Sequence, residues 1–209
     1  MSNMNIKPMT ISFTNITKYV SFMSPLLITF FMIMISIFNN NILKGVIFSM
    51  GLVIITFINY ILKNTLKETQ SPLASPFCNI LPSPFTVRGD NNVFVSPGLS
   101  STIIGYTCSY LIFPMKINNQ LNPSLITFLI VLLCINGVVE IQDKCASIGG
   151  VVLGAIVGIL FGILYYTLIS TSGHRNLAYF SETISNNSQC SKPSAQKFKC
   201  EVYKNGQKL

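Results

Sequence analysis

An uncharged apolar segment, residues 145–169, constrains the fold of this chain more than any other feature of the sequence. It exceeds the ~20 residues that a helix needs to cross a bilayer, and so predicts a membrane-spanning helix. Within it, glycine recurs at every fourth position: Gly150, Gly154, Gly158 and Gly162. Residues four apart share one side of a helix, and small residues there let a second helix come close. These glycines are therefore predicted to form a helix-packing face.

The composition also favours a multi-pass integral membrane protein. Half of the residues are hydrophobic and 10% are charged, whereas soluble domains carry about 25% charged residues. The formal net charge is +8, and such an excess is expected near lipid headgroups. The partners that we predict are the lipid bilayer and neighbouring membrane, coat or capsid proteins, with a second copy of the chain as an alternative. Specific binding of nucleic acid is not predicted.

The hydropathy pattern divides the chain into a polar N-terminal segment (1–18), a helical hairpin (19–62), a Pro-rich loop (63–97), a three-helix region (98–169) and a basic tail (170–209). Because the apolar segments approach the length of a bilayer crossing, the predicted fold class is all-α. The architecture is a transmembrane bundle of about five spans with a basic polar C-terminal tail. The third span, 98–115, is rich in Ser, Thr and Tyr, so we expect it inside the bundle rather than against lipid.

The basic tail is the predicted contact with a partner or with lipid headgroups. Its candidate binding residues are the lysines Lys192, Lys197, Lys199, Lys204 and Lys208. Apolar residues alternate with polar ones just before Asn205-Gly206, which predicts a small β element with a turn at that dipeptide. Cys190 and Cys200 lie in the tail, and a disulfide between them is a candidate if that side of the membrane is oxidising. The absence of a C-x-x-C pair argues against a zinc site, and no metal or cofactor is predicted.

Few residues of the chain are suited to catalysis. The single histidine, His174, precedes Arg175 just beyond the last span. It could bind phosphate, but we favour an interfacial role at a helix C-terminus. Glu140 and Asp143 could form a proton relay, but they fall in the turn between two spans, where we expect both side chains to be solvated. One histidine cannot serve as both nucleophile and general acid, so we predict no catalytic residues and no enzyme activity.

The second half of the chain nevertheless carries a degenerate motif order. Lys67 precedes a Pro-rich stretch, residues 96–99 read Ser-Pro-Gly-Leu, and Asp143 and Lys144 precede the glycine-rich span. This order resembles the membrane-bound type-2 phosphatidic acid phosphatases, which have Lys-x6-Arg-Pro, Pro-Ser-Gly-His and Ser-Arg-x5-His-x3-Asp. Leu99 occupies the position of the first histidine, and no histidine precedes the last span. The resemblance therefore implies a related bundle without that family's activity.

These observations favour a structural protein that packs within a membrane and links it to a protein layer. The Ile-, Asn- and Lys-rich composition suggests the internal membrane of a large DNA virus as one location. The alternatives are a lipid-phosphate phosphatase-like enzyme and a transporter or channel subunit, although neither midspan charges nor an inverted repeat is evident. The orientation stays open, because charges near the spans favour one side as cytoplasmic and charges of the whole tail favour the other.

Overall fold

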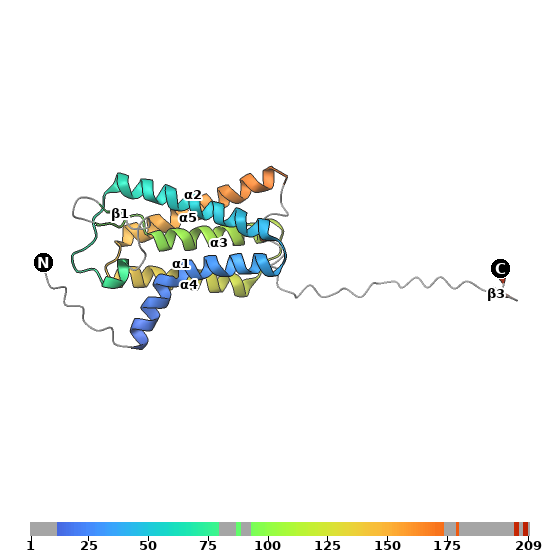
Figure 1. The fold of residues 1–209 in the computed structure, drawn as a ribbon, viewed down its shortest axis with the longest axis horizontal. Coiled ribbons are helices and arrows are strands. Elements are labelled where there is room, and N and C mark those ends of the chain that lie inside the picture. The colour runs from blue at the N-terminus through green and yellow to red at the C-terminus, as the bar shows by residue number, and fades with distance from the viewer. Residues whose placement is uncertain are drawn as a thin grey trace.

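The computed structural model describes residues 12–79, 87–88, 93–173, 179, 203–204 and 207–208. Within these residues, five α-helices run back and forth in one bundle (Figure 1): α1 (Phe13–Phe38), α2 (Ile42–Leu66), α3 (Leu99–Ile117), α4 (Pro123–Gln142) and α5 (Ile148–Thr171). The predicted all-α helical bundle is therefore confirmed.

Four of the five helices in the described part of the chain, α1, α2, α4 and α5, are long and apolar enough to cross a membrane. This fits an integral membrane protein. The remaining helix, α3, is the predicted third span, and its Ser and Thr residues keep it out of that set. It contacts all four other helices, and every residue from 100 to 111 is buried. The expectation that this segment lies inside the bundle is confirmed.

Local signals in the sequence define the helix starts and the tight turns. The Asn122 Oδ1 atom accepts from the backbone N–H of Leu125 at 3.3 Å, and Pro123 follows at the first helical position, where proline is favoured. The Ser147 hydroxyl accepts from the N–H of Gly150 at 3.0 Å. Both residues are N-caps that satisfy an otherwise unpaired helix N–H. In the turn after α1, Asn40 has a φ of 53°, a left-handed conformation that asparagine tolerates.

Helix α1 begins at Phe13, so it includes the end of the segment that we predicted to be polar and non-spanning. Its first turns lie at an angle to the rest of the helix (Figure 1). Pro25 lies inside α1, and proline bends a helix because it removes one main-chain hydrogen bond and clashes with the preceding turn.

The segment between α2 and α3 folds across one end of the bundle. Helix α2 continues through Lys63 to Leu66, so the predicted loop begins later than residue 63. The loop contains a short 3₁₀ helix, η1 (Pro76–Asn79), and two paired antiparallel strands, β1 (Val87–Arg88) and β2 (Val93–Phe94). A further bridge joins Phe94 to Thr69, which ties the end of the loop to its beginning.

In the tail, strands β3 (Tyr203–Lys204) and β4 (Gln207–Lys208) pair antiparallel, with Lys204 opposite Gln207. The predicted small β element of the tail is thus confirmed, while Asn205 and Gly206 lie outside the described residues. The alternating residues 197–202 lie outside the described part of the chain.

Candidate functional site

The end of the bundle that carries the α2–α3 loop and the α4–α5 turn contains a buried polar cluster. We call this end the polar end. Five side chains from α2, α3 and α4 form the polar cluster: Asn59, Lys63, Ser101, Thr102 and Glu140. None is more than 6% exposed. Buried polar groups are costly unless they are hydrogen-bonded or paired, so the partners of these side chains decide what the cluster can do.

Hydrogen bonds within the polar cluster join three helices. The Asn59 amide of α2 donates to the Thr102 hydroxyl of α3 at 2.9 Å and to the main-chain carbonyl of Pro97 at 3.3 Å. The Ser101 hydroxyl of α3 donates to Glu140 Oε2 of α4 at 3.0 Å. Lys63 and Glu140 interact electrostatically across the same cluster. Helix α3 is thereby held on two sides by polar contacts.

The expectation that Glu140 and Asp143 are solvated is wrong. Helix α4 extends through Glu140 to Gln142, and the two acidic residues are 4% and 7% exposed. Lys18 of α1 forms a salt bridge with Asp143. The sequence places both acids beside the apolar segment, but the groups that neutralise them come from helices far away in the chain.

A second polar contact holds α1 against α4. The amide of Asn136, which is 1% exposed, donates to the main-chain carbonyl of Ser21 at 3.0 Å. With the salt bridge between Lys18 and Asp143, α1 and α4 share two polar contacts separated by about two helical turns along α4. Such contacts between membrane helices stabilise their association by about 0.6–2 kcal/mol each.

The four glycines of α5 lie against α3 and the residues just before it. A Cβ on Gly154 would lie 2.5 Å from the carbonyl oxygen of Gly98, and one on Gly158 would lie 2.2 Å from that of Thr102. Gly162 lies against Tyr106 and Ser109, and Gly150 against Ser96. The partner of the glycine face is therefore a helix of the same chain, which the spacing alone could not identify.

A disulfide between Cys78 and Cys145 connects the α2–α3 loop to the α4–α5 turn. The two residues are 67 apart in sequence, and their Cα atoms are separated by 5.2 Å. Nearby, the N–H of Ser75 donates to the carbonyl of Asp143 at 3.0 Å. We did not predict this bond, because neither cysteine has a neighbour in sequence that indicates pairing. The candidate pair Cys190 and Cys200 lies outside the described residues.

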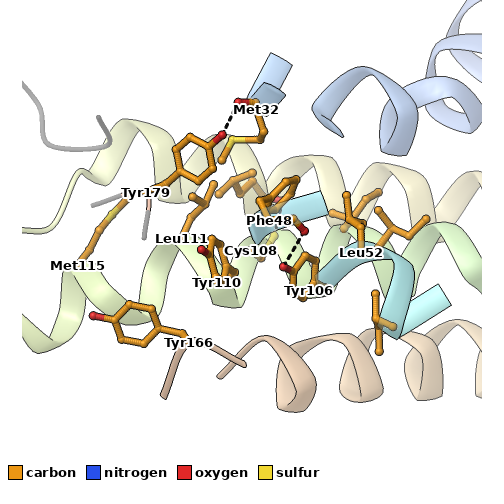
Figure 2. Packing of buried hydrophobic residues seen from close by; sticks show 14 residues of the cluster. Met32, Phe48, Leu52, Tyr106, Cys108, Tyr110, Leu111, Met115, Tyr166 and Tyr179 are labelled. Carbon is orange, nitrogen blue, oxygen red and sulfur yellow. Dashed lines mark hydrogen bonds between the residues drawn. The ribbon is translucent and has the colours of Figure 1, made fainter. Parts of the chain in front are cut away.

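An aromatic cluster fills the bundle beyond the polar cluster (Figure 2). The ring of Phe48 in α2 stacks on Tyr106 of α3 with centroids 5.5 Å apart, and Tyr179 contacts Phe48 edge-on at 6.0 Å. The Tyr106 hydroxyl donates to the carbonyl of Phe48 at 3.2 Å, and the Tyr179 hydroxyl donates to that of Met32 at 2.6 Å. The phenol groups thus bond to main-chain carbonyls and hold the rings in place.

The predicted tail residues cannot be placed in a site. His174, Lys192, Lys197 and Lys199 lie outside the described part of the chain, as does Arg175. Lys204 and Lys208 belong to β3 and β4, where the structure describes the backbone pairing.

Two positions that resemble the phosphatase motifs lie at helix ends: Lys67 is the C-cap of α2, and Leu99 is the first residue of α3. Gly98, beside Leu99, approaches the Glu140 carboxylate and so adjoins the polar cluster.

The polar cluster joins helices through hydrogen bonds and holds one basic and one acidic side chain, Lys63 and Glu140. Among the residues that the structure describes, no three or more His, Cys, Asp or Glu side chains gather to hold a metal ion.

Our sequence reasoning missed Asn59 and Lys63. Both lie on α2, and their spacing of four puts them on one side of that helix. A polar residue within an apolar helix usually faces the bundle interior, and this was the signal available in the sequence.

Comparison with known proteins gives no assignment, because no family model, curated protein or solved structure matches the chain. The resemblance to the type-2 phosphatidic acid phosphatases therefore stays a prediction.

Proposed function

We propose that the chain is a non-catalytic structural membrane protein, a helical bundle that anchors a membrane to a protein layer through its basic tail. One observation carries the proposal: the charged side chains packed at the polar end contact other helices of the bundle. Lys18 binds Asp143, and Glu140 receives a hydrogen bond from Ser101 while interacting with Lys63. A catalytic group has to reach a substrate, whereas these groups reach other helices.

The tail supplies the second part of the proposal. It carries five lysines and Arg175 beyond the last helix, and a basic segment is attracted to acidic protein surfaces or anionic lipid headgroups. We propose a coat or capsid protein with an acidic surface as the partner. The internal membrane of a large DNA virus is then a suitable location, in line with the composition of the chain.

Crosslinking tests the proposed partner. The full-length protein is kept in its native membrane and treated with an amine-reactive crosslinker, and the proteins joined to the tail lysines are identified by mass spectrometry. A coat or capsid protein supports the proposal. A lipid-metabolising enzyme as the main product, or no protein product, contradicts it.

The role of tail charge is tested with matched variants. Replacing Lys192, Lys197, Lys199, Lys204 and Lys208 together by glutamine should weaken partner binding by about tenfold or more, because five charge contacts are lost. Replacing the same lysines by arginine keeps the charge and should leave the affinity within about twofold. Equal affinities for the two variants would show that tail charge does not hold the partner.

One observation favours the alternative of an enzyme acting on lipid phosphates. Lys63, Glu140 and Gly98 lie together at the start of α3, where the resembling family has a conserved motif. Purified protein in detergent should release no phosphate from phosphatidic acid. Release that is lost in Lys63→Met, Lys67→Met, Arg88→Met or His174→Ala, but retained in the control Lys116→Met at the other end of α3, would replace the structural proposal.

A further inference from the structure

The position of the Cys78–Cys145 disulfide bears on how the bundle lies in the membrane. Both cysteines belong to segments between helices, and both segments lie at the polar end. The other cysteines in the described residues, Cys108 and Cys134, are unpaired and lie within α3 and α4. The disulfide is therefore confined to one end of the bundle.

Packing around the disulfide fixes the two segments together. Cys145 is buried with Phe22 of α1 and Val139 of α4, and Phe77 and Cys78 pack against them. The hydrogen bond from Ser75 to Asp143 joins the same two segments. The bond is thus part of a small folded unit at the polar end.

Disulfides persist in oxidising compartments and are rare in the cytosol, where thiols are kept reduced. The helices run back and forth (Figure 1), so the α1–α2 turn, the α3–α4 turn and the end of α5 lie at the opposite end. We infer that the polar end faces an oxidising compartment, and that the basic tail beyond α5 faces the cytosol. This inference does not depend on the proposed function.

The charge of the tail agrees with this orientation, whereas the Lys and Arg residues beside the helices do not separate the two ends. Cytosolic segments carry an excess of Lys and Arg, and the opposite end has Lys116 and the basic tail. Lys44 at that end is buried, and the segments of the polar end also carry Lys67, Arg88 and Lys144. At the polar end, Lys18 is bound to Asp143 and Lys63 is buried beside Glu140. These two lysines stabilise the bundle, so they are poor indicators of which side is cytosolic.

Glycosylation in cells tests the orientation. A flexible segment with a glycosylation acceptor is inserted after Leu73, which is 73% exposed, in the full-length chain carrying Asn15→Gln. The tail keeps its own acceptor, Asn186. We expect the inserted acceptor to be glycosylated and Asn186 to stay unmodified, as read from gel mobility before and after enzymatic deglycosylation. Asn186→Gln is the matched control and should leave the pattern unchanged.

A second readout follows the cysteines. In the variant Cys190→Ser/Cys200→Ser, mass spectrometry without reduction should find the Cys78 and Cys145 peptides linked. A tag at the C-terminus should be digested by protease added to the cytosolic side of sealed membranes. Glycosylation of Asn186, protection of the tag, or free thiols at Cys78 and Cys145 would each overturn the inference.

Discussion

Gly158 of α5 lies directly against the main chain of α3 at Thr102, so closely that a Cβ on Gly158 would be 2.2 Å from the Thr102 carbonyl oxygen. Such a distance leaves no room for a side chain. In membranes, where lipid tails are as apolar as leucine, helices associate through close packing of this kind and through polar contacts. The α3–α5 contact uses close packing, because α3 lies in the groove that the glycines leave. Just before α3, the N–H of Gly98 also donates to the carbonyl of Gly150 at 2.9 Å.

Replacing Gly158 by alanine should destabilise the bundle by about 1–3 kcal/mol, the range for overpacking, because the group in the way is backbone and cannot rotate aside. Unfolding in mixed detergent micelles, followed by circular dichroism, measures the change. Gly149→Ala is the matched control on the same helix, since its Cβ would find its nearest atom 3.8 Å away, at Ser147. Equal losses in the two variants would contradict the α3–α5 contact.

Replacing Asn59 by alanine should cost about 0.6–2 kcal/mol, because the bonds to Thr102 and Pro97 hold α2 to α3. The same unfolding assay applies. Asn64→Ala serves as the control: the Asn64 amide donates to Tyr60 of its own helix at 3.2 Å, so its loss should change stability by less than about 0.5 kcal/mol. A larger effect at Asn64 than at Asn59 would argue against the polar cluster as a link between helices.

Replacing Lys18 by methionine should destabilise the protein by about 2 kcal/mol. Breaking a fully buried ion pair costs about 3–5 kcal/mol, but the Lys18 side chain is 27% exposed and water compensates part of the loss. The double variant Lys18→Met/Asp143→Asn should recover much of the stability, since it removes the unpaired carboxylate. A double-mutant cycle measures the coupling, and additive single effects would mean that the two residues do not interact.

Tyr179 connects the region beyond α5 to the bundle, and two variants separate its hydroxyl from its ring. Tyr179→Phe removes the bond to the Met32 carbonyl and should cost about 1 kcal/mol. Tyr179→Ala also removes the ring packed on Phe48 and should cost about 3 kcal/mol. Thermal unfolding in detergent measures both. The exposed Tyr60 is the control, and Tyr60→Phe should have no measurable effect.

The fold was predictable to the extent that it depends on local properties of the chain. Uninterrupted apolar segments indicate where the helices lie. Asparagine is a residue type favoured at helix caps and in tight turns, which accounts for the cap at Asn122 and the turn at Asn39–Asn41. The end of α4 was predicted too early, because Glu140 looked like the first residue of a solvated turn. Its partner Ser101 is 39 residues away, and no local pattern reveals such a partner.

The contacts at the polar end likewise join residues that are far apart in the sequence. Lys18 and Asp143 are 125 residues apart, and Cys78 and Cys145 are 67 apart. The glycine spacing indicated that a helix packs on α5. The sequence could not say which helix, because the choice depends on how the other segments fold around it.

Helix α3 is the most buried of the helices in the described residues. It is also the one helix among them that is not apolar enough to count as a membrane span by its own composition. A hydroxyl-rich segment enters lipid poorly by itself, and its close-fitting neighbour α5 is synthesised after it. Insertion of α3 should therefore be completed only when the last helix leaves the ribosome, and a chain truncated before Ile148 should leave α3 outside the bilayer and open to chaperones.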